Sequence, residues 1–150
     1  MNFIKLAGCA MLLASVLFIN GCGFDTASLD DPTDYPDIGS FLGMDLSVWN
    51  AFLPQKILIQ SHEETSQEAV ITDPETIRSA VAAFQKIRIG KEERIRYTDS
   101  DVLVIFVFAG DREISIPFEH RNLVLGDKVF HTDNTAPLFA ILNKALESES

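Results

Sequence analysis

The sequence predicts an α+β domain in which helices pack on one face of an antiparallel β-meander. Three observations support this fold class. Short strand-like runs crowd the second half of the chain. Two Gly-Asp pairs, Gly110-Asp111 and Gly126-Asp127, follow such runs as hairpin turns do. Segments with helical spacing of apolar residues precede and follow the runs, so we expect helices to cover the sheet.

The first half of the domain is expected to hold two helices and two strands. One set of apolar residues recurs at helical spacing and predicts a short helix that Pro54 ends. That set is Leu42, Leu46, Trp49 and Leu53. Strands are expected at residues 56–60 and 69–72. Asp73 can cap a second helix that has Pro74 at its first position. The buried face of this helix is predicted to be Ile77, Ala80, Val81 and Phe84.

The second half is expected to hold four strands and a final helix. Residues 102–108 form a continuous apolar run, which suits a central strand covered on both faces. The next strand alternates apolar and polar residues, and Pro117 belongs at an edge or a strand end because it cannot donate a ladder hydrogen bond. Two strands follow at 123–125 and 128–131, then a helix at 135–147. Its predicted apolar stripe is Leu138, Ile141, Leu142 and Ala145.

Composition excludes several classes of function. The chain has 150 residues, 47% of them apolar, and a formal net charge of −10. Such an acidic chain repels the phosphates of nucleic acid and the surface of an anionic membrane, so neither is an expected partner. The cysteines are Cys9 and Cys22 only, which leaves the body of the chain without a disulfide or a thiolate metal site.

The N-terminus has the layout of a secretory signal. Residues 1–5 carry one positive side chain, Lys5, and residues 6–19 are apolar and uncharged. This apolar stretch is shorter than the roughly 20 residues that span a bilayer. Ile19-Asn20-Gly21-Cys22 follows, and three of its four positions fit the signal of bacterial lipoproteins, which this segment resembles.

The resemblance implies that residues 1–21 are removed and that Cys22 carries lipid. The protein would then be anchored in the cell membrane or the outer membrane, facing outside the cytoplasm. Two or more acyl chains, each methylene contributing about 0.8 kcal/mol, give stable anchoring. The alternatives are a cleaved secretory signal with Cys22 free, or an uncleaved anchor.

The mature chain is expected to consist of a tether, one domain and a short tail. It has 11 basic and 22 acidic residues, a net charge of −11, because residues 1–21 contain only Lys5. Residues 22–40 comprise the lipidated cysteine and an acidic, proline-containing segment, which predicts a flexible tether. The domain is expected at 41–147 and the tail at 148–150. Calcium binding by the tether is a weaker alternative, since Asp30, Asp31, Asp34 and Asp37 lack the glycine and distal glutamate of a calcium loop.

No motif specifies a reaction, a cofactor or a metal, so we predict no catalytic residue, no cofactor and no metal ligand. There is no nucleophile elbow and no glycine-rich phosphate loop. His120 and His131 could meet across a hairpin, with Glu119 or Asp133 nearby, to form a zinc site. Exposed turn histidines are the preferred interpretation of both.

A cluster of basic residues is the main candidate for a partner surface. Six of the mature chain's positive charges lie within 19 residues, at Arg78, Lys86, Arg88, Lys91, Arg94 and Arg96. Arg88, Arg94 and Arg96 are taken as a possible patch for an anionic envelope polymer or an acidic protein. Intramolecular charge balance is the competing interpretation, because Glu92 and Glu93 lie inside the cluster.

The expected function is therefore a non-enzymatic binding or interaction module, held at the cell envelope by its lipid. An envelope hydrolase would require a pocket that gathers His120 or His131 with carboxylates. An inhibitor or immunity-type lipoprotein, which neutralises an extracellular enzyme, is a third hypothesis. The sequence does not distinguish among possible ligands or oligomeric states.

Overall fold

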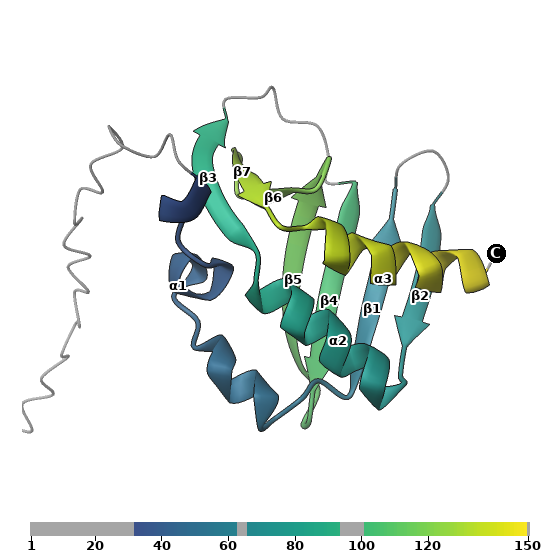
Figure 1. Cartoon of the computed structure of the whole chain (residues 1–150). Coiled ribbons are helices and arrows are strands. Elements are labelled where there is room, and N and C mark those ends of the chain that lie inside the picture. The colour runs from purple at the N-terminus through teal and green to yellow at the C-terminus, as the bar shows by residue number, and fades with distance from the viewer. Residues whose placement is uncertain (1–31, 63–65, 94–100, 150) are drawn as a thin grey trace, which may run out of the picture.

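The computed structural model describes residues 32–62, 66–93 and 101–149, which form one antiparallel seven-stranded sheet with helices on one face (Figure 1). The strands are β1 (Lys56–Ser61), β2 (Gln67–Ile71), β3 (Arg88–Glu93), β4 (Val102–Phe108), β5 (Arg112–Glu119), β6 (Asn122–Leu125) and β7 (Lys128–Asp133). Their order across the sheet is β2-β1-β4-β5-β6-β7-β3. Strands β4 to β7 form the predicted meander, which the β1–β2 hairpin and β3 extend on its two sides.

Helices α2 (Pro74–Gln85) and α3 (Ala136–Ser148) cover the same face of this sheet (Figure 1). The start of α2 is as predicted, since the Asp73 carboxylate accepts a hydrogen bond of 2.8 Å from the Thr76 N–H. The predicted face of α2 is buried. In α3, Leu138 and Leu142 are buried as predicted, while Phe139 and Leu146 complete the buried face. Ile141 and Ala145 are half-buried at its margin.

The core between the helices and the sheet is rich in aromatic rings. Trp49 stacks on Phe84 with ring centroids 5.7 Å apart, and it also contacts Phe106 and Phe108 at 4.9 and 5.0 Å. Phe84 and Phe106 are fully buried. Strand β4 therefore contributes alternate side chains to the core, as its apolar run predicted, and Ile105 and Val107 on its opposite face are buried too.

The domain begins earlier than predicted, because residues 35–40 pack on the sheet and are not part of a tether. Ile38 is fully buried. Its N–H donates to the Ile87 carbonyl at 2.9 Å, and the Ile89 N–H donates to the Pro36 carbonyl at 2.9 Å. These bonds pair the segment with the outer edge of β3. A short 3₁₀ turn, η2 (Pro32–Asp34), precedes it. The remainder of the predicted tether, Cys22 and the signal lie outside the described residues.

The single helix predicted around residues 41–53 is instead two short pieces, α1 (Ile38–Leu42) and η3 (Leu46–Asn50). Gly43 ends α1 in the left-handed conformation, with φ of 68°. Asp45 then caps η3 by accepting a hydrogen bond from the Ser47 N–H at 3.0 Å. Pro54 follows the helical region, as predicted. The helical spacing of apolar residues continues from α1 into η3, although the chain leaves the helix at Gly43 and starts a new one after Asp45.

Strand β3 was not predicted, and it contains part of the basic cluster. It pairs with β7 at the edge of the sheet, with a bulge between Ile89 and Glu92. None of the described helices is long and apolar enough to cross a lipid bilayer.

Candidate functional site

The tight turn between β5 and β6 has a backbone conformation that its residues rarely adopt. Glu119 pairs with Asn122, which leaves His120 and Arg121 as a two-residue loop. Their φ angles are 47° and 66°. Positive φ at both central residues is typical of a type I′ turn, where Asn-Gly is preferred. For residues with a Cβ this conformation costs roughly 1–2 kcal/mol each. The turn is therefore held by its surroundings.

Asp101, immediately before β4, holds the first residue of this turn. Its Oδ2 accepts a hydrogen bond of 2.8 Å from the His120 backbone N–H and lies 3.0 Å from His120 Nδ1. The Asp101 side chain is 20% exposed, whereas the His120 side chain is 81% exposed. Asp101 is thus the fixed partner, and the imidazole projects from it into solvent. The Asp101 carbonyl also accepts the His62 N–H at 2.7 Å, which ties the end of β1 to the same point.

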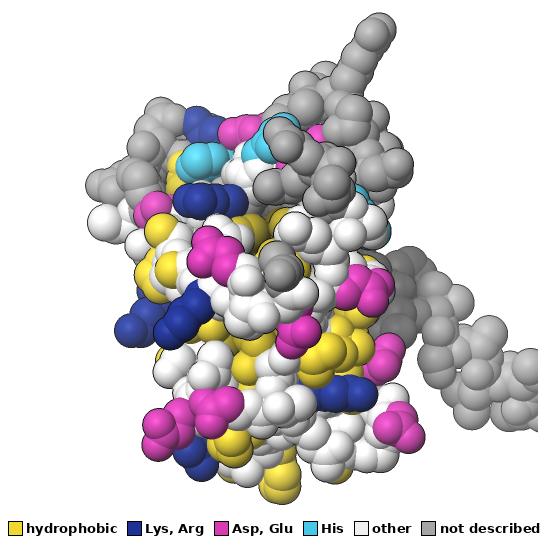
Figure 2. Space-filling model, turned by 90° about the vertical axis from the view of Figure 1, so that its right-hand side faces the viewer, with side chains coloured by type: hydrophobic (Ala, Val, Ile, Leu, Met, Phe, Trp, Pro, Cys, Tyr) yellow, Lys and Arg dark blue, Asp and Glu magenta, His cyan; other side chains and the backbone are white. Residues whose placement is uncertain are grey.

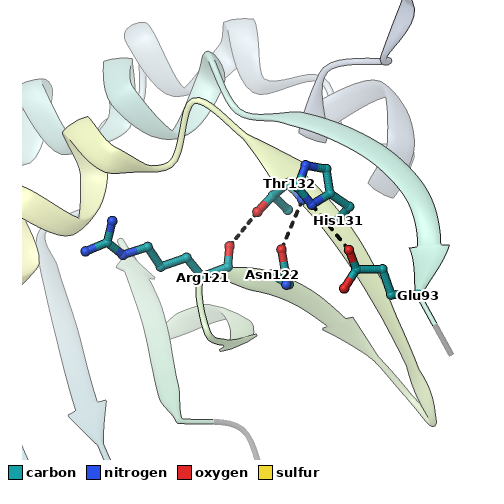
Figure 3. Close-up of polar contacts among 5 residues, drawn as sticks. All are labelled: Glu93, Arg121, Asn122, His131 and Thr132. Carbon is teal, nitrogen blue, oxygen red and sulfur yellow. Dashed lines mark hydrogen bonds and ion pairs between the residues drawn. The ribbon is translucent and has the colours of Figure 1, made fainter. Parts of the chain in front are cut away.

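Thr132 on β7 holds the second residue of the turn. Its hydroxyl donates to the Arg121 carbonyl, and its N–H donates to Asn122 Oδ1 at 3.3 Å (Figure 3). Thr132 is buried, so these bonds are shielded from water. The Arg121 guanidinium lies 5.6 Å from the centre of the Phe139 ring on α3. This cation–π contact directs Arg121 toward α3.

A cleft of about 550 Å³ opens between this turn, the adjoining ends of the sheet and α3. Its floor consists of buried apolar residues, namely Val102, Phe118, Phe139 and Leu146. Its polar lining includes Gln67, Asp101, His120, Arg121, Asn143 and Glu147, and Ser61 lies buried among them. Figure 2 shows histidine, basic and acidic side chains gathered around apolar ones at the upper end of the molecule. Seven of the eleven residues that line the cleft are polar, so the cleft suits a ligand with several polar groups as well as some apolar surface.

His131 belongs to a different cluster, so the zinc site considered as the weaker alternative for His120 and His131 does not form. His131 Nδ1 lies 3.4 Å from Glu93 Oε1, whereas His120 is paired with Asp101. The side chain of Arg121, in the β5–β6 turn, and that of His131, on β7, extend in different directions (Figure 3). Within residues 32–62, 66–93 and 101–149, no three His, Cys, Asp or Glu side chains are placed to hold a metal ion.

The predicted basic patch is only partly described. Arg94 and Arg96 lie outside the described residues. Arg88 is exposed on β3, and its Nη1 donates to the Tyr35 carbonyl at 3.5 Å. Hydrogen bonds from Ser40, together with the positive charge of Arg88, lower the pKa of Asp37. Arg88 is therefore engaged within the chain at the docked N-terminal segment, where Asp37 caps α1.

From its sequence context Asp101 was interpreted as a solvated loop carboxylate, and His120 was a candidate only for a zinc site or a hydrolase pocket. The signal that was available is the spacing of the two strands. The alternating run 114–118 and the continuous apolar run 123–125 are separated by a stretch without glycine, which requires an unusual turn at His120 and Arg121. Comparison with protein-family models, curated proteins and solved structures finds no match.

Proposed function

We propose that this chain is an exported lipoprotein, anchored by lipid on Cys22, whose domain binds a partner in the cleft beside the His120–Arg121 turn. The backbone conformation of this turn is the main evidence for a binding site. Two residues with unfavourable positive φ are kept where Asn-Gly would be relaxed. Strained backbone of this kind is concentrated at functional sites, and here both side chains line the cleft.

The chemistry of the cleft favours a ligand that carries both signs of charge and some apolar surface. Arg121 and, when protonated, His120 offer positive charge, while Asp101 and Glu147 offer negative charge. Gln67 and Asn143 add amide groups that donate and accept. A peptide segment of an envelope protein has this combination of groups. A uniformly anionic envelope polymer would meet the carboxylates unfavourably.

Site-specific photo-crosslinking in the producing cell tests the binding site. A photoreactive benzoylphenylalanine is placed at Asn143, which is exposed on α3 in the cleft, and at Ala82, which is exposed on α2, as the control. We expect a discrete peptide-containing adduct from position 143 only. Arg121→Ala should reduce its yield at least about threefold. Equal adducts at both positions, or an adduct indifferent to Arg121, would exclude the cleft.

The anchor is tested separately by intact mass and detergent partitioning of the wild type beside Cys22→Ser. We expect a mass that fits cleavage before Cys22 plus diacylglycerol, and loss of detergent partitioning in the variant. A free Cys22 or an intact Met1 terminus would contradict the lipid anchor.

A second candidate, an envelope hydrolase, is favoured by one observation. The His120–Asp101 pair shares the cleft with the buried Ser61, so a base and a hydroxyl occur in one pocket. Reaction with a fluorophosphonate probe distinguishes the two functions. Labelling of Ser61 that disappears in His120→Gln would indicate a serine hydrolase, whereas an unlabelled Ser61 in folded protein supports binding alone.

A further inference from the structure

Two large apolar side chains project from the end of the molecule opposite the cleft's turn, at the end of η3. Val48 is 47% exposed and Phe52 is 70% exposed. The Phe52 N–H donates to the Val48 carbonyl at 3.0 Å, which forms one helical turn. Residues four apart on such a turn lie side by side. Val48 and Phe52 therefore form one apolar pair, called here the apolar tip.

The apolar tip rests on a rigid base. Trp49, between the two, is 6% exposed and packs on three phenylalanine rings of the core. Gln85 on α2 donates to the Leu46 carbonyl at 2.7 Å, which fastens the start of η3. A hollow of about 460 Å³ beside the tip is lined also by Phe108 and Ile114, with Arg112 and Glu113 at its rim. The packing of Trp49 and the hydrogen bond from Gln85 therefore hold the two exposed side chains of the tip in a fixed position.

The proposed lipid anchor keeps the apolar tip close to a membrane. From Cys22 to Pro32 the chain advances ten residues. At no more than about 3.6 Å per residue, these span at most roughly 36 Å. The domain is therefore confined close to the lipid surface, and confinement of this kind raises the effective concentration of a weak second contact. One aromatic and one aliphatic side chain suit such a contact, because lipid anchoring supplies the remaining affinity.

We propose that the apolar tip inserts into the interface of the membrane that anchors the chain, and so fixes the orientation of the domain on the lipid surface. This inference rests on the proposed lipid anchor. The partner surface is a neutral, zwitterionic bilayer, because the mature chain carries a net charge of −11 and an anionic bilayer would repel it. The cleft lies at the His120–Arg121 end of the sheet and would remain open.

Trp49 supplies the readout, because it is the only tryptophan of the chain and adjoins Val48. The lipidated mature protein is reconstituted on phosphatidylcholine vesicles with and without bromine on the acyl chains, because bromine quenches tryptophan fluorescence at short range. We expect Trp49 to be quenched by the brominated lipid. Phe52→Ser and Val48→Ser should each lower that quenching at least about twofold. Val70→Ser is the matched control, since Val70 on β2 is a 49% exposed side chain away from the tip, and it should leave quenching unchanged.

Vesicle flotation in the same samples separates the two ways of failing. Protein that floats without Trp49 quenching, or with quenching indifferent to Phe52→Ser, overturns membrane insertion and leaves the anchor intact. Protein that does not float contradicts the anchor and with it this inference. Self-association that Phe52→Ser abolishes, without quenching, would show that a second copy covers the tip and would also overturn it. Near-UV circular dichroism checks that each variant is folded.

Discussion

The Asp101 carboxylate and His120 are joined twice, through the His120 backbone N–H at 2.8 Å and the His120 Nδ1 at 3.0 Å. The first bond bears on folding, because it stabilises a backbone with positive φ at the β5–β6 turn. The second bears on the site, because it sets the direction of the imidazole at the mouth of the cleft. One aspartate at the start of β4 therefore couples the stability of the turn to the geometry of the proposed binding site.

Removing this carboxylate should destabilise the domain. Asp101→Ala is expected to lower the free energy of unfolding by about 1–2 kcal/mol, since it deletes a partly exposed charged acceptor of a backbone hydrogen bond. Asp101→Asn keeps an acceptor and should cost less than half as much. Urea unfolding followed by circular dichroism measures both. If the two variants lose equal stability, the backbone hydrogen bond is not what holds the turn.

Replacing the strained turn should make the protein more stable and less functional. His120→Asn combined with Arg121→Gly introduces the residues that a type I′ turn prefers. We expect a gain of about 1 kcal/mol after loss of the Arg121–Phe139 contact. Crosslinking from Asn143 should fall at the same time.

Asp111→Gly is the control for the turn replacement. Asp111 also has a positive φ, 55°, but lies in the β4–β5 turn outside the cleft. The Asp111→Gly variant should be more stable than the wild type and should give the same crosslinking yield from position 143. A double variant at the cleft that gains no stability would show that the His120–Arg121 turn carries no strain.

Local patterns predicted the meander and the main helices well. The alternation of β5 and the cap formed by Asp73 and Pro74 depend on neighbours in sequence, so they can be recognised there. Strand β3 could not be recognised in the same way. Its residues are mostly charged, and it is a strand because β7 and the segment around Ile38 pair with its two edges.

The candidate site was harder to predict than the fold, because it too depends on contacts between residues that are distant in sequence. Asp101 lies 19 residues before His120, and only the register of β4 on β5 brings them together. His120 and His131 were placed in one possible site because the hairpin brings their strands together. In the structure His120 pairs with Asp101 and His131 pairs with Glu93, which sequence spacing does not reveal.

The cap of α2 gives a prediction about pH. Hydrogen bonds from the Thr76 hydroxyl and N–H lower the pKa of Asp73 below its usual value of 3.8. The unfolded chain therefore binds a proton at higher pH than the folded chain does. The stabilisation is complete above the unfolded pKa and is lost as pH falls through the lower folded pKa.

Asp73→Asn tests this linkage because asparagine caps a helix without titrating. Urea unfolding between pH 6 and pH 2 should show that the wild type loses more stability on acidification than this variant. Asp73→Ala lacks the cap at every pH and should be less stable than both near pH 6. Parallel pH profiles for wild type and Asp73→Asn would rule out a contribution from the Asp73 carboxylate.

The docking of the N-terminal segment on β3 depends on the absence of a side chain at Gly90. An added Cβ at Gly90 would lie 2.6 Å from Cε2 and 2.7 Å from Cζ of the Tyr35 ring, so the ring would have to move. Gly90→Ala is expected to cost about 1–3 kcal/mol, as overpacking does. Tyr35→Ala should remove the clash, so in a double-mutant cycle the two changes together should cost less than the sum of each alone. Urea unfolding of the four proteins measures this coupling. Strictly additive losses would mean that Tyr35 does not pack on Gly90.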